Sequence, residues 1–389
     1  MNFGEIEQLE EMFQVETYAK MNIALERGSG VWVTTNDGIR YLDLYGGHAV
    51  CATGHSHPHI VKAINTQLER IMFYSNIVYS EVRARAAEKL VSVSPSSIEK
   101  VFFCNSGTEA NENAMRMARF KTGREKIVSF SGGFHGRTAD AISATFLATY
   151  REIGKPNVPA HFEAEFGDIE TLAKVIDKNT AGVIIEPIQS MAGVREADPE
   201  FFIALRELCN RVGAVLIFDE VQTGIGRTGE WFYSASNFAG GVHADIITVA
   251  KSLGSGVPVG ACLVNDEVAA STKLNALGTT FGGGMIAMAA VLATLEAIES
   301  ENMIANAKAV EVFLREKIGH KKSVRAVRGK GCLLGIEFHP EVALAKDVHA
   351  NLLDKRIITG TSGDPNILRL LPPLCVSTEN IQNFLVNIE

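Results

Sequence analysis

Short apolar runs alternate along the middle of this chain with longer stretches in which apolar residues recur every three or four positions. The helical spacing predicts helices that include Thr108–Phe120 and Pro199–Val212. The apolar runs predict strands at Lys100–Cys104, Lys126–Ser129, Ala181–Ile185, Ala214–Phe218, Asp245–Val249 and Val259–Val264. Near-continuous apolar strands separated by helices are typical of a mostly parallel sheet covered on both faces, so we predict an α/β fold.

The two ends of the chain show other patterns. Two β-rich runs flank Asn36-Asp37-Gly38, which predicts a hairpin, and residues 57–93 then keep a helical spacing. From about Met285 a long helix leads into apolar runs at Ser323–Val327 and Leu333–Phe338. We therefore predict three parts: an N-terminal segment, 1–55, that packs with the small domain, a large domain, 56–285, and a small C-terminal α+β domain, 286–389.

Composition and charge narrow the class of protein. The chain of 389 residues has a net charge of −8 and scattered basic residues, so it lacks the basic footprint of a nucleic-acid-binding protein. Its acidic start does not resemble a signal peptide, and no apolar run is long enough to cross a membrane. The six cysteines form no CxxC pair, which favours a reducing compartment and predicts a cytoplasmic location.

Four predicted strands are followed by polar or reactive residues. In open α/β sheets, ligands bind outside the carboxyl ends of the strands. Taken singly, each of these residues has a plainer explanation, such as a helix cap or a buried ion pair. Their repetition at four strand ends indicates one ligand site, formed by Asn105-Ser-Gly, Glu186-Pro, Asp219-Glu and Lys251-Ser.

Two of these strand ends carry the chemistry of one particular cofactor. Asp219 ends an apolar strand, where an unpaired carboxylate is costly unless it meets a positively charged partner. Lys251 also ends an apolar run, and burial gives a lysine a lowered pKa and makes it a usable nucleophile and base. A lysine that forms an imine and an aspartate that keeps a pyridine nitrogen protonated are what pyridoxal 5′-phosphate (PLP) requires.

Two glycine-containing loops supply further candidate ligand contacts. Ser106 or Asn105 can cap the helix that follows Gly107 and Thr108, and the free N–H groups of its first turn suit a phosphate. The loop Ser131-Gly-Gly-Phe-His-Gly-Arg137 carries three functional side chains. Among them, Phe134 could stack on a planar ring and Arg137 could hold a carboxylate through two hydrogen bonds.

Three histidines alternate in Gly54-His-Ser-His-Pro-His59. Histidine is a common metal ligand, so a metal site was one interpretation. No carboxylate or cysteine spacing supports it, and Pro58 fits the first position of a helix. We therefore predict no metal.

With these residues in view, the chain resembles the class III (subgroup II) PLP-dependent aminotransferases from about Tyr18 to its C-terminus. Within that family it looks most similar to acetylornithine and ornithine aminotransferases. The resemblance implies PLP-dependent transferase fold type I, with a mostly parallel seven-stranded sheet in the large domain and a smaller α+β domain. The stretches that carry it are Tyr41-Leu-Asp-Leu-Tyr-Gly-Gly-His-Ala-Val50, Gly54-His-Ser-His-Pro58, Asn105-Ser-Gly-Thr-Glu-Ala-Asn111, Phe134-His-Gly-Arg137, Ile185-Glu-Pro187, Phe218-Asp-Glu-Val-Gln222, Ala250-Lys-Ser-Leu253, Gly278-Thr-Thr-Phe-Gly-Gly283 and Leu368-Arg-Leu-Leu-Pro-Pro373.

The resemblance also implies a role for each matching residue. Lys251 and Asp219 are the catalytic pair: Lys251 holds the cofactor and shuttles a proton, and Asp219 binds the pyridinium N–H. Arg369 grips a substrate carboxylate, and Arg137 holds another carboxylate or an acyl group. The family forms homodimers with shared active sites, in which Thr280 reaches a phosphate in the neighbouring subunit. The remaining cofactor-binding residues are Ser106, Gly107 and Thr108 near the phosphate, Phe134 and Val221 on the two ring faces, Gln222 at the ring hydroxyl, and His135 and Glu186 close by.

One departure concerns the substrate. Ornithine-type members usually read Glu-Pro-x-Gln-Gly-Glu, in which the last glutamate pairs with the arginine that corresponds to Arg369. That pair is thought to switch the arginine between a glutamate-binding and a diamine-binding state. Here the run is Glu186-Pro-Ile-Gln-Ser-Met191, and Met191 cannot form such a pair. The substitution leaves room for another amine donor.

The predicted function is amino-group transfer from an ω-amino donor, N-acetylornithine-like or ornithine-like, to a keto acid such as 2-oxoglutarate by a ping-pong cycle. One alternative is a class III ω-amine or 4-aminobutyrate-type transaminase, and another is a PLP aminomutase or racemase. A third alternative is a non-catalytic regulator with a PLP fold, which would need an added nucleic-acid-binding segment. The first 40 residues are too short and too acidic for that role.

Overall fold

The computed structural model describes residues 1–388 and contains three sheets. The central sheet has seven strands in the order β4-β10-β9-β8-β7-β5-β6. Five adjacent strands, from β9 to β6 in this order, are parallel to one another, and β10 runs antiparallel to both β9 and β4. The sheet is therefore mostly parallel, as predicted. Its strands are β4 (Lys100–Cys104), β5 (Lys126–Phe130), β6 (His161–Ala164), β7 (Thr180–Ile185), β8 (Val215–Asp219), β9 (Ile246–Val249) and β10 (Gly260–Val264).

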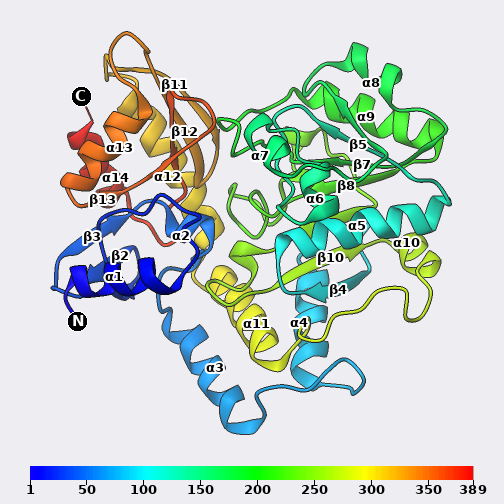
Figure 1. Ribbon diagram of the computed structural model, residues 1–389, viewed down its shortest axis with the longest axis horizontal. Helices are drawn as coiled ribbons and strands as arrows, with labels where there is room; N and C mark the ends of the chain where they lie inside the picture. The colour runs from blue at the N-terminus through cyan, green and yellow to red at the C-terminus, as the bar shows by residue number, and fades with distance from the viewer. Residues whose placement is uncertain (389) are drawn as a thin grey trace.

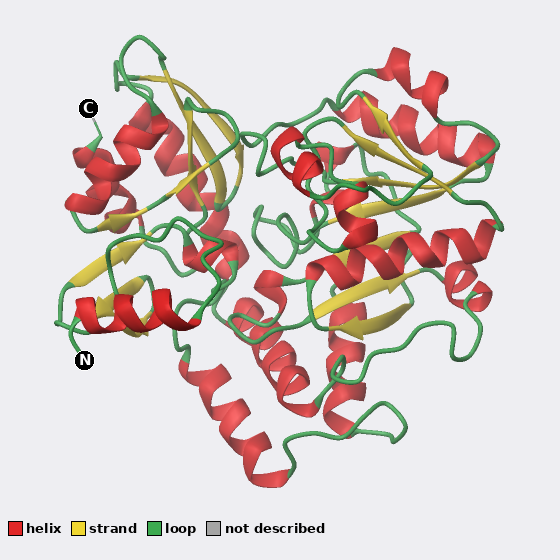
Figure 2. Ribbon diagram, viewed as in Figure 1, coloured by secondary structure: helices red, strands yellow, loops and turns green. Residues whose placement is uncertain are grey.

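Helices cover both faces of this sheet because its strands are apolar on both sides (Figure 2). Along β8, Val215 and Ile217 belong to the core cluster that includes α5. Leu216 and Phe218, which point the other way, belong to the cluster that includes α9. The helices of the large half are α3 (Pro58–Arg70), α4 (Glu81–Ser92), α5 (Gly107–Thr122), α6 (Ala139–Ser143), α7 (Ala148–Ile153), α8 (Ile169–Val175), α9 (Pro199–Val212), α10 (Asp266–Ser271) and α11 (Met285–Ser300), with the short 3-10 helices η1 (Tyr233–Ala235), η2 (Asn237–Ala239) and η3 (Lys251–Leu253).

Both chain ends lie in the other half of the molecule, beside two four-stranded sheets (Figure 1). One sheet joins the two ends of the chain, because β13 pairs with β3 in parallel, Ile357 opposite Leu42. Its strands are β1 (Leu25–Ser29), β2 (Trp32–Thr35), β3 (Arg40–Asp43) and β13 (Ile357–Ile358), and those of the other sheet are β11 (Val324–Lys330), β12 (Leu333–Phe338), β14 (Gly360–Thr361) and β15 (Ile367–Leu370). The helices are α1 (Phe3–Phe13), α2 (Gly46–Ala49), α12 (Met303–Ile318), α13 (Ala345–Asp354) and α14 (Thr378–Asn387).

The division at residues 55 and 285 remains a proposal, which the pairing of β3 with β13 supports. Two local predictions differ from the structure. The stretch 57–93 is not one helix, because residues 71–80 separate α3 from α4. The edge strand β6 was missed, since two of its four residues are exposed and it forms no apolar run. Among the described residues, no helix has the length and apolar character needed to cross a membrane.

Candidate active site

The four polar strand ends lie at one edge of the central sheet. Since β4 and β9 both run antiparallel to β10, they point the same way as β8 and β7. A cavity of about 480 Å³ opens at this edge. Most of the predicted site residues line it: Ser106, Gly107, Thr108, Phe134, His135, Arg137, Glu186, Asp219, Val221, Gln222 and Lys251.

Lys251 begins the turn η3, directly after Ala250 at the end of β9. Its φ of 40° lies in the left-handed region, which a lysine rarely adopts. Burial lowers the pKa of Lys251 to about 8, although the carboxyl groups of Asp219 and Glu186 oppose the shift. The lysine is therefore closer to its neutral, nucleophilic form at neutral pH than an exposed lysine.

The Asp219 carboxylate is held by several hydrogen bonds and is 3% exposed. Its Oδ2 accepts a hydrogen bond from Asn111 Nδ2 at 2.7 Å and lies 2.8 Å from His135 Nδ1. Its Oδ1 accepts from the Val221 N–H at 3.1 Å. Asn111 is fixed in turn, because its Oδ1 accepts from Thr248 Oγ1 at 2.6 Å. The aspartate thus has a fixed orientation at the cavity wall.

A second carboxyl group lies nearby. Burial and the adjacent charge of Asp219 raise the pKa of Glu186 to about 8. Its Oε1 accepts the backbone N–H of Phe134 at 2.7 Å, which ties the loop after β5 to the end of β7. The Phe134 ring packs edge-on against Tyr150, with ring centroids 5.1 Å apart. These contacts hold the Phe134 side chain at the cavity.

The N-terminus of α5 also faces the cavity. Ser106 caps this helix, because its Oγ accepts the Glu109 N–H at 3.2 Å. The first N–H groups of a helix have no partner within it, so those of Gly107 and Thr108 remain for a ligand. A Cβ at Gly107 would lie 3.0 Å from both Val221 methyl groups. Glycine therefore keeps α5 close to the floor of the site.

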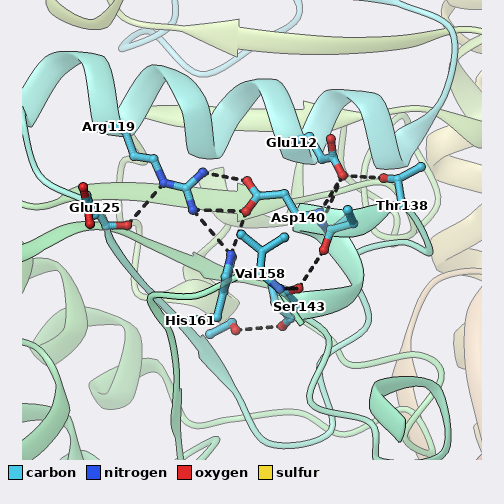
Figure 3. A network of polar contacts seen from close by, with 12 residues as sticks. Glu112, Arg119, Glu125, Thr138, Asp140, Ser143, Val158 and His161 are labelled. Atoms are coloured by element: carbon cyan, nitrogen blue, oxygen red, sulfur yellow. Dashed lines mark hydrogen bonds and ion pairs between the residues drawn. The ribbon is translucent and has the colours of Figure 1, made fainter. Parts of the chain in front are cut away.

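A polar network anchors the loop after β5 to α5 (Figure 3). Thr138 Oγ1 lies 2.6 Å from Thr108 Oγ1 and donates to Glu112 at 2.6 Å. Further along, Asp140 pairs with Arg119 at 2.7 Å and with His161 at 2.7 Å. Burial would raise the pKa of Asp140, but hydrogen bonds from His161 and Arg119 outweigh it and lower that pKa to about 2. These bonds therefore link the two elements that would contact a phosphate.

Two buried side chains at the cavity have polar atoms without a hydrogen-bond partner among the described residues. Both polar atoms of the Gln222 amide are buried and have no hydrogen-bond partner within residues 1–388. The Nε2 of His135 is also buried and has no hydrogen-bond partner among the described residues. Buried polar groups normally have partners, so a polar group is expected here. The residues present fit PLP, which offers a phosphate, a ring nitrogen and a ring hydroxyl.

Arg137 belongs to this group, whereas two other predicted residues, Arg369 and Thr280, do not line the cavity. Arg137 lines the cavity, and its guanidinium lies 4.6 Å from the Tyr150 ring and 5.9 Å from the Tyr18 ring. Arg369, on β15, is buried, is not among the residues that line the cavity, and donates to Tyr45 and Ser190. Thr280 is exposed and does not line the cavity.

Some residues at the site were not assigned a role from the sequence. Asn111 has no predicted role, although an asparagine in the apolar face of a predicted helix is a usable signal. His48, which lines the cavity, follows two glycines in an otherwise apolar run. Tyr45, which bonds to Arg369, gave no sequence signal because its partner lies more than 300 residues away.

The three alternating histidines each pair with a separate carboxylate. His55 lies 2.7 Å from Asp43, His57 lies 3.0 Å from Glu301, and His59 lies 2.8 Å from Glu296. Within the part of the chain that the structure describes, no group of three or more His, Cys, Asp or Glu side chains could hold a metal ion.

Comparison with known proteins gives one family. The model of the class-III aminotransferases matches residues 13–389. The acetylornithine aminotransferase of Archaeoglobus fulgidus is 40% identical over 368 residues, which cover 94% of this chain and 95% of that protein. The acetylornithine aminotransferase of Methanopyrus kandleri is also 40% identical and covers 98% of this chain and 97% of its own.

Solved structures agree with this relationship. The ornithine aminotransferase of Toxoplasma gondii, in a crystal structure with partial occupancy of PLP at its active site, superposes with a TM-score of 0.92 at 25% identity and covers 100% of this chain and 93% of its own. The acetylornithine aminotransferase of Elizabethkingia anophelis superposes with a TM-score of 0.85 at 29% identity, over 100% of this chain and 98% of its own.

Proposed function

The chain belongs to the class-III aminotransferases, and from that premise we propose that it uses PLP to move an amino group from an N-acetylornithine-like or ornithine-like donor to 2-oxoglutarate. That it is an aminotransferase acting on a keto acid follows from the family. The cofactor contacts, the choice of donor and the choice of acceptor are our proposal. The cytoplasmic location also stays a prediction. It is supported by the six cysteines, all of which are free.

One observation carries the cofactor proposal. Lys251, with its lowered pKa, and Asp219, with its fixed carboxylate, line the same cavity as the N-terminus of α5 and the unpartnered Gln222 amide. Enzymes of this family work with PLP. One cofactor bound in this cavity would account for the lysine, the aspartate, the helix N-terminus and the glutamine amide together.

Each residue has a defined task in the reaction. PLP, when bound, supplies an aldehyde and an electron-accepting ring. Lys251 would hold the aldehyde through Nζ and, as the base of the site, would take the proton from the amine-bearing carbon of the donor. Asp219 would keep a proton on the ring nitrogen, and Gln222 would donate to the ring hydroxyl. Val221 and Phe134 would contact the two faces of the ring and exclude water.

Two arginines account for the substrate class. Arg137 stands at the mouth of the cavity between the rings of Tyr18 and Tyr150. Its side chain is exposed, so it can meet the carboxylate or acyl end of an extended donor. Arg369 lies deeper and holds a second carboxylate. A donor with a terminal amine and a distant carboxylate would supply an anionic partner for this positive charge.

We also propose a homodimer with shared active sites. The segment 71–80 exposes a row of apolar side chains, among them Ile77 at 83% and Tyr79 fully exposed. Phe281, beside Thr280, is 66% exposed and packs on Phe73. An adjacent cavity of about 670 Å³ contains none of the predicted site residues. A second copy that covers this surface would bury it and would bring Thr280 to the neighbouring phosphate site.

The mechanism is tested by replacing Lys251. Lys251→Ala should abolish turnover and the visible absorbance of a lysine-bound cofactor, because no other side chain supplies the imine. Normal turnover in Lys251→Ala would defeat the mechanism. Lys273→Ala, which removes an exposed lysine remote from the cavity, serves as the matched control.

The substrate is tested by half-reactions of the PLP-loaded enzyme. N-acetylornithine, ornithine, lysine, 4-aminobutyrate and simple amines should be compared as donors, with and without 2-oxoglutarate. Only a transaminase requires the keto acid for sustained turnover, whereas an aminomutase or racemase does not. A marked preference for amines without a carboxylate would contradict the roles of Arg137 and Arg369.

A further inference from the structure

Arg369 is a buried cation with uncharged partners. Its Nε donates to the carbonyl oxygen of Thr361 at 2.7 Å, its Nη1 to Ser190 Oγ at 3.2 Å, and its Nη2 to Tyr45 Oη at 2.8 Å. It is 2% exposed, and no carboxylate of residues 1–388 lies within ion-pair distance. A buried charge without a counter-ion is costly, and burial lowers the pKa of Arg369 accordingly. An anion that arrives with a ligand would remove this cost.

The Tyr45 hydroxyl connects Arg369 to His48. Its oxygen accepts from Arg369 and lies 2.6 Å from His48 Nδ1. Because the guanidinium can only donate, the single hydroxyl proton goes to Nδ1. Burial and the positive charges of Arg369, Lys251 and Arg137 lower the pKa of His48 to about 3, so the ring is neutral. Its proton is therefore on Nε2, which has no hydrogen-bond partner among the described residues.

A strained turn fixes the place of His48. Residues 46–49 all have φ between 57° and 70°, in the left-handed region. Gly46 allows a close approach, because a Cβ there would lie 2.8 Å from the carbonyl oxygen of Leu371. Asp43 Oδ1 accepts the Gly46 N–H at 2.9 Å and stabilises the turn. Backbone held in a sparsely populated region commonly marks a functional position.

We infer that Tyr45 positions Arg369 and His48 as one unit that binds a single carboxylate of the keto acid. Arg369 supplies the charge, and the Nε2–H of His48 supplies a second, uncharged donor. Neither side chain is paired with a carboxylate, so no ion pair has to break before the keto acid binds. The inference rests on the proposed function, since it concerns the acceptor of that reaction, and it makes Tyr45 a positioning residue and His48 a specificity-determining residue.

The test uses glutarate, which has two carboxylates but no reactive carbonyl. Its binding to the PLP-loaded enzyme is measured by calorimetry, and the KM and kcat for 2-oxoglutarate are measured in parallel. Tyr45→Phe and His48→Leu should each weaken glutarate binding about tenfold, the effect expected for a hydrogen bond to a charged group. In both variants the KM for 2-oxoglutarate should rise by more than kcat falls.

Two further variants separate recognition from folding. His48→Gln restores a side-chain donor and should recover most of the glutarate affinity lost in His48→Leu. Tyr41→Phe removes the same hydroxyl from a tyrosine on β3 that does not line the cavity, and it should bind glutarate as the unmodified enzyme does.

The outcomes that overturn the inference are distinct from failure of the proposed function. Unchanged glutarate affinity in Tyr45→Phe and His48→Leu would overturn it, and so would a loss of kcat at unchanged KM. Failure of the unmodified enzyme to aminate 2-oxoglutarate would instead reject the proposed acceptor. In that event the glutarate series would still decide whether Tyr45 and His48 form a carboxylate site.

Discussion

At the scale of single residues, the environment of Lys251 sets its protonation. Burial lowers its pKa to about 8 from the 10.5 of a free lysine, so the neutral form is lost as pH falls below about 8. Borohydride trapping of PLP on the cofactor-free enzyme should therefore increase with pH around a midpoint near 8. Lys251→Ala measures trapping by other lysines. A midpoint above 10 would show that the site does not perturb this amine.

Met191 is a second residue with a measurable consequence. It lines the cavity, where an added carboxylate would repel the carboxylates of the keto acid and compete for Arg137 or Arg369. Met191→Glu should raise the KM for 2-oxoglutarate at least about tenfold, equivalent to about 1.4 kcal/mol. Met191→Gln has the same shape without the charge and should have a smaller effect. Equal effects of the two variants would refute the electrostatic explanation.

The sequence predicted some of these residues and missed others for a physical reason. Lys251 and Asp219 were predictable because each follows an apolar strand, and parallel strands bring their carboxyl ends together. The contact of Tyr45 with Arg369 depends instead on how the two ends of the chain meet. The position of the His48 side chain depends on a left-handed turn. The two glycines before it allow this turn but do not force it, so the sequence alone does not predict it.

At the scale of elements, the approach of α5 to the loop after β5 depends on one glycine. Gly136 has φ 135°, and a Cβ there would lie 2.2 Å from Thr108 Oγ1. Gly136→Ala should therefore displace the N-terminus of α5 and weaken PLP binding at least about tenfold, measured by equilibrium dialysis.

Gly123, at the other end of α5, provides the matched control for that change. Its φ is 67°, but a Cβ there meets nothing within 4 Å. Gly123→Ala should lower the free energy of unfolding by about 1 kcal/mol through backbone strain and leave PLP affinity unchanged. Equal PLP affinities in Gly136→Ala and Gly123→Ala would exclude the proposed phosphate contact of this loop and helix.

The elements themselves were largely predictable, but their order in space was not. Six strands of the central sheet were predicted from apolar runs, since a strand buried on both faces has no polar alternation. The seventh, β6, pairs only with β5 at the edge and has two exposed residues out of four, so it lacks that pattern. The placement of β10 between β4 and β9 comes from long-range packing that no local pattern encodes.

At the scale of the whole molecule, the proposed dimer makes the active site depend on a second copy of the chain, which would cover the exposed segment 71–80 and contribute Thr280. Ile77→Asp places a charge in the proposed interface and should give a monomer by light scattering, with weakened PLP binding. Ile153→Asp changes another highly exposed isoleucine, on α7 and outside segment 71–80, and should leave the dimer intact.

A mixing experiment tests the shared site directly. Lys251→Ala removes the lysine from its own cavity, whereas Thr280→Ala removes the group that its subunit lends to the partner. In a mixed dimer of the two variants, one cavity has both Lys251 and the partner subunit's Thr280, and the other has neither. Random exchange makes about half of the dimers mixed, so up to about a quarter of the sites should be intact.

The recovery is measured at limiting PLP, where Thr280→Ala alone should be nearly inactive because its phosphate site is weakened. Adding Lys251→Ala protein, which has no activity of its own, should then raise turnover in proportion to the mixed dimer formed. Adding Lys251→Ala, Thr280→Ala double-variant protein should give no such rise, since it lends no threonine. A Thr280→Ala enzyme that binds PLP normally, or equal rises in the two mixtures, would mean that each chain completes its own active site.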